Sequence, residues 1–237
     1  MFDYIISCYF GSRRSSMINA HLLKDNFYLI NEHLKFLNEN LHTINDINNI
    51  IFTINGGSDV LVNDLKKITE DYSFSNKIII QSRVNSGYSY AAWNFALEDR
   101  LNNNTDSDYA FLCEDDYVPC DANFYNIFIG YFKDDVAYVC QLYTTLDRKY
   151  QPHPAISNGF ISYKTAREVY SEYNKIFDLN YDIGYKNAEL NQINFLNYFK
   201  NYRFLDITDN YFSRFLHLDV IKTYGNENSK EIIKPII

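Results

Sequence analysis

The first half of the chain alternates short apolar runs with longer segments of helical spacing. Four nearly continuous apolar runs have the composition of strands buried on both faces, and they span residues 2–10, 50–54, 77–81 and 109–113. Helical spacing marks three segments between them, over residues 17–41 (with an expected break near 25–26), 60–72 and 88–101. This alternation predicts an α/β fold with a mainly parallel central sheet and right-handed crossovers.

The second half of the chain mixes short strands and helices around a long loop. Apolar runs predict strands over residues 136–143, 160–163, 203–207 and 211–216. Helical spacing predicts helices over residues 121–131, from a cap at Thr165, and over 188–199. We find no linker or low-complexity tract, and therefore expect one domain over residues 1–237.

Three adjacent carboxylates follow the fourth apolar run directly. Glu114, Asp115 and Asp116 stand between Cys113 and Tyr117. Buried charges need partners and these three repel one another, so a divalent cation would relieve them. Carboxylate oxygens suit Mg²⁺ or Mn²⁺, and open α/β sheets bind ligands at the carboxyl ends of their strands. The pattern favours a metal site there, and the alternative is a solvated acidic turn.

Composition and charge narrow the classes of function. Hydrophobic residues make up 46% of the 237 positions, which is enough for a substantial core. The formal net charge is −8 and no run of Lys and Arg is long enough to follow a nucleic-acid backbone, which argues against a nucleic-acid partner. An acidic protein that binds an anionic phosphate ligand needs a cation or well-placed arginines, and this agrees with the metal hypothesis. The absence of a Gly-x-Gly-x-x-Gly motif disfavours a dinucleotide enzyme.

The cysteines and the amino terminus bear on the compartment. None of the four cysteines forms a Cys-x-x-Cys pair, which argues against zinc and suits a reducing compartment. No basic segment follows Met1 and no apolar run reaches the length of a membrane span, so we expect no signal peptide and no integral membrane segment. A cytoplasm-like location is the resulting expectation.

Several segments, taken in order, resemble the GT-A glycosyltransferases, enzymes that move a sugar from a nucleotide-sugar donor. Ile50–Asp59 is similar to their second strand ending in a Ser-x-Asp-type turn, and Arg83–Leu97 to their Asn-x-Gly … Ala-x-Asn segment. Glu114–Asp116 resembles their acidic, DxD-like metal motif in its Glu-Asp-Asp form. His217 follows a late strand, where many of them supply a further metal ligand. The resemblance covers about residues 2–219, and its specificity lies in the order and spacing of the segments.

The resemblance implies a fold and a division of the chain. The fold would be GT-A, a Rossmann-like mixed sheet, mainly parallel, flanked by helices. Residues 1–119 would form the nucleotide-sugar-binding half and residues 120–220 the acceptor-side half, followed by a tail over 221–237.

The resemblance also implies roles for the acidic residues. Asp116 would bind Mn²⁺ or Mg²⁺ directly, with His217 as a further ligand. Asp115 would contact the ribose or the water shell of the metal, and Glu114 would hold the nucleotide side or orient its neighbours. The metal would bridge the diphosphate and neutralise charge on the leaving nucleotide.

Four other residues are implied on the donor side. Tyr9 lies near the end of the first predicted strand, where the nucleotide would be cradled, and Asp59 would contact the base or ribose. Arg83 would contact the phosphates, and Asn85 lies in the same donor-binding segment, where with Gly87 it would shape the turn. Asp59 has a second interpretation as a helix cap, and Arg83 as a partner for a surface acid.

The catalytic base is less clearly marked. An inverting enzyme needs a carboxylate to deprotonate the acceptor hydroxyl, but Lys186-Asn187 stands where the family has acids. Asp182 and Glu189 remain as candidates, Asp182 ahead because it lies in a non-helical part, and each has a second interpretation as an ordinary surface acid. Inverting and retaining transfer both stay open, with inverting favoured because the first half resembles that branch.

The function implied is that of a hexosyltransferase-like, metal-dependent glycosyltransferase. Its donor would be a UDP- or GDP-sugar and its acceptor a glycan or another hydroxyl compound. One alternative is a sugar-phosphate nucleotidyltransferase, of whose phosphate loop Gly11-Ser12-Arg13 is a faint echo. Another is a catalytically inactive glycan-binding domain of the same fold, which Lys186-Asn187 suggests.

Overall fold

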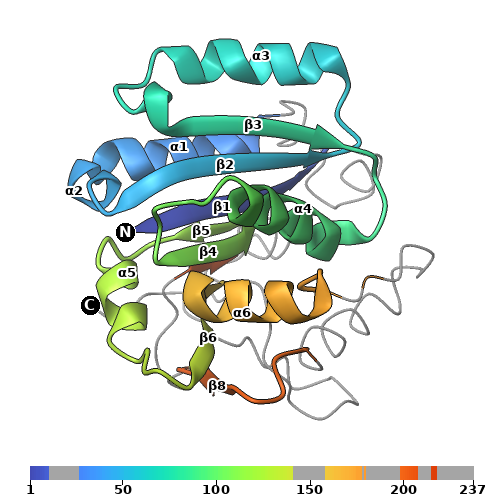
Figure 1. The fold of residues 1–237 in the computed structure, drawn as a ribbon. Helices are drawn as coiled ribbons and strands as arrows, with labels where there is room; N and C mark the ends of the chain where they lie inside the picture. The colour runs from blue at the N-terminus through green and yellow to red at the C-terminus, as the bar shows by residue number, and fades with distance from the viewer. Residues whose placement is uncertain (11–26, 141–157, 178, 180–197, 208–214, 218–237) are drawn as a thin grey trace, which may run out of the picture.

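The computed structural model describes residues 1–10, 27–140, 158–177, 179, 198–207 and 215–217 (Figure 1). Its strands are β1 (Phe2–Tyr9), β2 (Ile47–Asn55), β3 (Ile78–Arg83), β4 (Tyr109–Glu114), β5 (Tyr117–Pro119), β6 (Val136–Cys140), β7 (Gly159–Ser162), β8 (Arg203–Asp206) and β9 (Phe215–His217). Its α-helices are α1 (Tyr28–Glu39), α2 (Leu41–Ile44), α3 (Asp59–Glu70), α4 (Tyr88–Asn102), α5 (Phe124–Ile129) and α6 (Tyr163–Tyr173), with a 3₁₀ turn, η3, at Ser75–Lys77. The expected loop over 144–157 lies outside the described residues, as do residues 17–26 and 188–197 of two predicted helices.

Seven strands form one mixed, mainly parallel sheet in the order β3-β2-β1-β4-β7-β6-β8. The first four strands in this order run parallel to one another. Strand β7 runs antiparallel to both β4 and β6, and β8 runs parallel to β6. A separate two-stranded ribbon joins β5 to β9 in antiparallel register. The α/β class and the mainly parallel sheet predicted from the sequence are confirmed.

Helices cover both faces of the sheet, which explains why the strands lack polar alternation. On one face, Tyr4 and Ile6 of β1 pack in the cluster that contains the buried side of α1. The other face is covered by α4 and α6 (Figure 1), and there Ile5 packs in the cluster that contains Trp93 and Val169 of these helices. Every residue from Phe2 to Cys8 is therefore buried, whichever way its side chain points.

Two helix starts show how local chemistry sets the element bounds. Ser58 caps α3, and its hydroxyl accepts a hydrogen bond from the Leu61 amide. Ser162 caps α6 by accepting from the Thr165 amide. The prediction of a cap at Thr165 is therefore wrong by three residues, because Thr165 already lies inside the helix and its hydroxyl donates to the Ser162 carbonyl.

A buried carboxylate organises the amino edge of the sheet. Asp3 is fully buried in β1, where its oxygens accept from Asn49 (2.8 Å), Ser107 (2.7 Å), Thr105 (3.1 Å) and Tyr163 (2.9 Å). The Arg100 guanidinium lies 3.5 Å away and balances its charge. This network joins β1, β2, α4 and α6 at the edge opposite the acidic turn.

Candidate active site at the carboxyl edge of the sheet

The strand order reverses between β1 and β4. The chain proceeds from β1 outward to β2 and β3, then returns through α4 to place β4 on the other side of β1. In open α/β sheets, ligands bind outside the carboxyl ends of the strands at such a reversal. Here those ends are Tyr9 of β1 and Glu114 of β4.

The acidic turn lies at this reversal. Glu114 ends β4, Asp115 and Asp116 form the turn, and Tyr117 starts β5. Asp115 is buried, its amide donates to the Ser7 carbonyl (3.0 Å), and its Oδ2 accepts from the Tyr9 amide (3.0 Å). The carboxyl end of β1 therefore binds Asp115 from two sides, and the half-buried Asp116 follows a residue whose place is fixed.

A buried histidine supports the same turn from α1. His33 is fully buried, its Nε2 lies 3.2 Å from the Asp115 carbonyl oxygen, and its Nδ1 lies 2.6 Å from the Tyr4 hydroxyl. A carbonyl only accepts, so Nε2 carries the hydrogen, and Nδ1 of the neutral ring accepts from Tyr4. Burial lowers the pKa of His33 from its ordinary 6.5 to about 4, so the ring is neutral at pH 7.

Glu114 contacts the start of α4. The Ser89 hydroxyl donates to Glu114 Oε1 at 2.5 Å, and Ser89 lies in the first turn of the helix. Two consecutive residues at this helix start have positive φ, the N-cap Gly87 (72°) and the first helical residue Tyr88 (54°). Trp93, one turn further on, donates from its indole to the Cys113 carbonyl at 3.0 Å. These contacts hold the amino end of α4 beside the acidic turn.

Three residues lie in register across the ends of β1, β2 and β3. Tyr9 pairs with Asn55, and Asn55 pairs with Arg83. The Arg83 guanidinium donates to Asn55 Oδ1 (2.6 Å) and to the Ser86 carbonyl (2.8 Å). The Asn55 amide donates in turn to Ser7 Oγ (3.3 Å). Tyr9 and Arg83, two of the residues predicted to bind the nucleotide-sugar donor, are thus brought to one edge of the sheet, with Asn55 between them.

The remaining predicted donor residues lie on the loops of the same edge. Asp59 is exposed in the first turn of α3, where its carboxylate interacts favourably with the helix dipole. The residue that caps this helix is Ser58, not Asp59. Asn85 is exposed after β3, and a Cβ built on Gly56 would lie 2.9 Å from its Cβ. Gly56 also has φ +75°, so two loops meet at a position that requires glycine.

The ribbon β5–β9 brings the chain around His217 to the acidic turn. His217 is the register partner of Tyr117, the residue that follows Asp116. Asp182 and Glu189, the predicted base candidates, lie outside the described residues. Among the described residues, no group of three or more His, Cys, Asp and Glu side chains is placed to hold a metal ion. The carboxylates of the acidic turn are nevertheless of a kind that fits Mg²⁺ or Mn²⁺, because such ions are commonly held by one or two carboxylates together with substrate phosphates.

Comparisons with known proteins bear on the fold. At the level of sequence, the chain matches no protein-family model and no curated protein. Its structure is similar to the mannosyltransferase PcManGT from Pyrobaculum calidifontis in complex with GDP-Man and Mn²⁺, with a TM-score of 0.55 and 11% identity. That match covers 88% of this chain and 55% of the mannosyltransferase chain, so this chain spans little more than half of that protein.

A second similar structure is a putative glucose-1-phosphate thymidylyltransferase from Bacillus anthracis in complex with a sucrose. The TM-score is 0.58 at 14% identity, over 100% of this chain and 98% of that one. The fold is GT-A-like. Identities this low show the fold alone, and they leave the reaction to the residues of the site.

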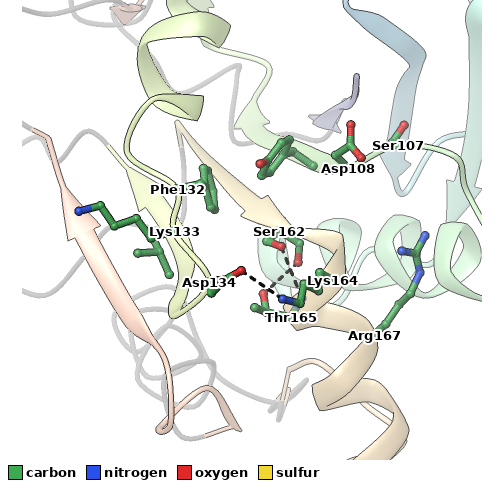
Figure 2. A pocket seen from close by; sticks show the side chains of 11 residues that line it. Ser107, Asp108, Phe132, Lys133, Asp134, Ser162, Lys164, Thr165 and Arg167 are labelled. Atoms are coloured by element: carbon green, nitrogen blue, oxygen red, sulfur yellow. Dashed lines mark hydrogen bonds and ion pairs between the residues drawn. The ribbon is translucent and has the colours of Figure 1, made fainter.

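The GT-A-like fold also has a pocket at the amino edge of its sheet (Figure 2). Its volume is about 560 Å³, and Tyr109, Phe132 and Thr165 are among the residues that line it. Lys164 Nζ lies 3.4 Å from an Asp134 carboxylate oxygen in its wall. Because β4 starts at Tyr109, this pocket lies at the opposite end of that strand from Glu114.

Sequence reasoning missed three residues that shape the carboxyl edge of the GT-A-like fold: His33, Asn55 and Ser89. Asn55 had a local signal, since it stands at a strand end directly before two glycines. His33 had one as well, because it occupies the apolar phase of its helix, three residues after Ile30 and one before Leu34. Ser89 carries no such signal, because its partner Glu114 is 25 residues away.

No helix within the described parts of the chain is long and apolar enough to cross a membrane.

Proposed function

We propose that this chain is a metal-dependent glycosyltransferase that moves a sugar from a UDP- or GDP-sugar to a glycan or another hydroxyl acceptor, with inversion favoured. The observation that carries the proposal is the acidic turn Glu114–Asp116 at the carboxyl ends of the two strands where the sheet order reverses. The GT-A-like fold supports it, as does a similar structure whose complex contains GDP-Man and Mn²⁺. A cytoplasm-like compartment is part of the proposal, on the cysteine pattern of the sequence.

The proposal gives each acidic residue a role. Asp116 binds the divalent cation, and His217 is a second ligand from the neighbouring strand β9. Asp115 fixes the turn through β1 and lies beside the ribose or the water shell of the cation. Glu114, held by Ser89, orients the nucleotide side of the turn. When bound, the cation supplies Lewis-acid stabilisation of the charge on the leaving nucleotide.

Recognition of the nucleotide-sugar donor is proposed for the residues at the carboxyl ends of β1, β2 and β3, beside this turn. Arg83 lies at the carboxyl end of β3, and a guanidinium pairs well with phosphate oxygens, so we assign the donor phosphates to it. Tyr9, Asp59 and Asn85 border the nucleoside. On the acceptor side, Asp182 or Glu189 takes the proton from the attacking hydroxyl.

A test measures nucleotide release from a panel of nucleotide sugars with Mn²⁺, with and without sugar acceptors. Release of UDP or GDP that rises with an acceptor supports the proposal. We expect Asp116→Ala to lower this rate by at least about 100-fold, because a direct metal ligand matters at least as much as its outer-shell partners. Asp106→Ala is the matched control, since Asp106 is an exposed acid in a loop at the opposite edge. Normal turnover by Asp116→Ala would refute the metal assignment.

A nucleotidyltransferase is the second candidate, because the match to the putative thymidylyltransferase spans nearly the whole of both chains. That reaction joins a nucleoside triphosphate to a sugar phosphate and releases pyrophosphate. Pyrophosphate release without release of UDP or GDP from nucleotide sugars would favour it. Glycan binding with neither reaction would favour an inactive glycan-binding domain.

A further inference from the structure

Asp115 is held by all of its backbone polar groups and by one carboxylate oxygen. Its amide donates to Ser7 and its Oδ2 accepts from Tyr9, both on β1. Its carbonyl accepts from His33, which lies on α1. Two elements on different sides of the residue therefore determine the path of the chain into Asp116.

The contact from α1 is itself supported. Tyr4 and His33 are both fully buried, and the Tyr4 hydroxyl donates to His33 Nδ1 at 2.6 Å. The Tyr4 ring stacks on Phe111 of β4, with 5.2 Å between ring centroids. The imidazole is thus oriented from one side by a rigid, packed phenol, and its Nε2–H points at the Asp115 carbonyl. Burial raises the pKa of the Tyr4 hydroxyl, which keeps its hydrogen available for this contact.

Peptide geometry carries this orientation to the next residue. In a trans peptide the C=O and the following N–H point in opposite directions in one plane. With the Asp115 carbonyl directed at His33, the Asp116 amide points away from α1, and the direction in which the Asp116 side chain leaves the turn is set. Loss of the His33 contact would allow this peptide to rotate.

We propose that His33, oriented by Tyr4, is a positioning residue that fixes the Asp115–Asp116 peptide and so presents the Asp116 carboxylate to a divalent cation. This inference rests on the proposed function for the role of Asp116. The placement of the peptide by His33 is a separate, structural statement, and the experiment measures both.

The experiment compares two buried Tyr→Phe variants on opposite faces of the sheet. Tyr4→Phe removes the hydroxyl that orients His33, whereas Tyr163→Phe removes a fully buried hydroxyl that donates to Asp3. We expect hydrogen exchange of the Asp115 amide to accelerate by about 10-fold in Tyr4→Phe and to stay within about 2-fold in Tyr163→Phe. Affinity for Mn²⁺, measured with UDP and separately with GDP, should fall by about 10-fold in Tyr4→Phe alone.

Two further variants separate orientation from general stability. His33→Gln keeps an N–H that reaches the Asp115 carbonyl and should stay within about 3-fold of the wild type in both measurements. His33→Leu keeps an apolar side chain but removes the donor, and should reproduce Tyr4→Phe or exceed it. If His33→Leu and Tyr4→Phe behave like Tyr163→Phe, the inference is wrong.

The Asp116→Ala variant tells the two failures apart. If it binds Mn²⁺ with nucleotide as the wild type does, the metal assignment of the proposed function fails, together with the metal part of this inference. The exchange of the Asp115 amide then still decides whether His33 fixes the turn. If Asp116→Ala loses metal binding while His33→Leu retains it, the proposed function stands and the positioning role is refuted.

Discussion

Acidification from about pH 7.5 to about pH 5 should destabilise this protein through His33. The native structure holds this ring neutral, because it is fully buried between Tyr4 and the Asp115 carbonyl and its pKa is lowered to about 4. In the unfolded chain the same ring titrates near its ordinary value of 6.5. Between these two values the unfolded chain binds more protons than the native protein, so stability falls as the pH falls.

The size of the effect follows from the two pKa values. A difference of one pKa unit corresponds to about 1.4 kcal/mol, so the full loss between the two values is about 3 kcal/mol. At about pH 5 the unfolded His33 is almost wholly protonated and the native one almost wholly neutral, which corresponds to about 2 kcal/mol. This is a sizeable part of a typical free energy of unfolding of about 5–15 kcal/mol.

The assay is urea unfolding of the wild type and of His33→Gln at the two pH values. Gln does not titrate and retains a donor for Asp115, so subtracting its pH dependence removes the contribution of every other titrating group. The wild type should lose about 2 kcal/mol more than His33→Gln on acidification, which moves its midpoint by on the order of 1 M urea. Equal losses within about 0.5 kcal/mol would show that His33 is not held neutral in the native protein.

Two substitutions test contacts that stabilise the fold, one in the buried network of Asp3 and one at the turn of Gly56. Asp3→Ala should destabilise the protein by about 3–5 kcal/mol in urea unfolding at neutral pH, because it leaves the Arg100 guanidinium without its buried carboxylate; a loss below about 1 kcal/mol would contradict this assignment. Gly56→Ala should lower stability by about 1–3 kcal/mol, because φ is +75° and the new Cβ would lie 2.9 Å from that of Asn85. Gly130→Ala is its control, since a Cβ there would lie 3.5 Å from the Ile127 carbonyl oxygen, an ordinary contact, and equal losses of stability for the two variants would be evidence against strain at Gly56.

Much of the sheet was predictable because burial on both faces leaves a continuous apolar run. Strands β1, β3 and β4 start and end within one or two residues of the predicted ranges. Strand β2 starts three residues before its predicted range, because Asn48 and Asn49 interrupt the apolar pattern. Asn49 is a polar residue with a buried partner, Asp3, and such pairs hide a strand from hydrophobic periodicity.

Other elements were beyond local patterns. Strand β5 contains only three residues, and it is defined by pairing with β9, nearly a hundred positions later in the chain. From the sequence, the cap of α6 is predicted at Thr165 instead of Ser162. Both residue types are good caps, and only the backbone conformation selects between them.

The candidate site, like the fold, has a part that the sequence predicts and a part that it does not. Three adjacent carboxylates after an apolar run are visible in any reading of the sequence, so their place at a strand end was predictable. What holds them is not, since Asp115 is bound by Tyr9 across 106 positions and by His33 across 82. The sequence therefore predicts which carboxylates could bind a cation. How each of them is positioned depends on these distant contacts. Asp115 is enclosed by β1 and α1, whereas Asp116, the residue that follows it, is only half-buried, and this difference is why the proposed function assigns the cation to Asp116.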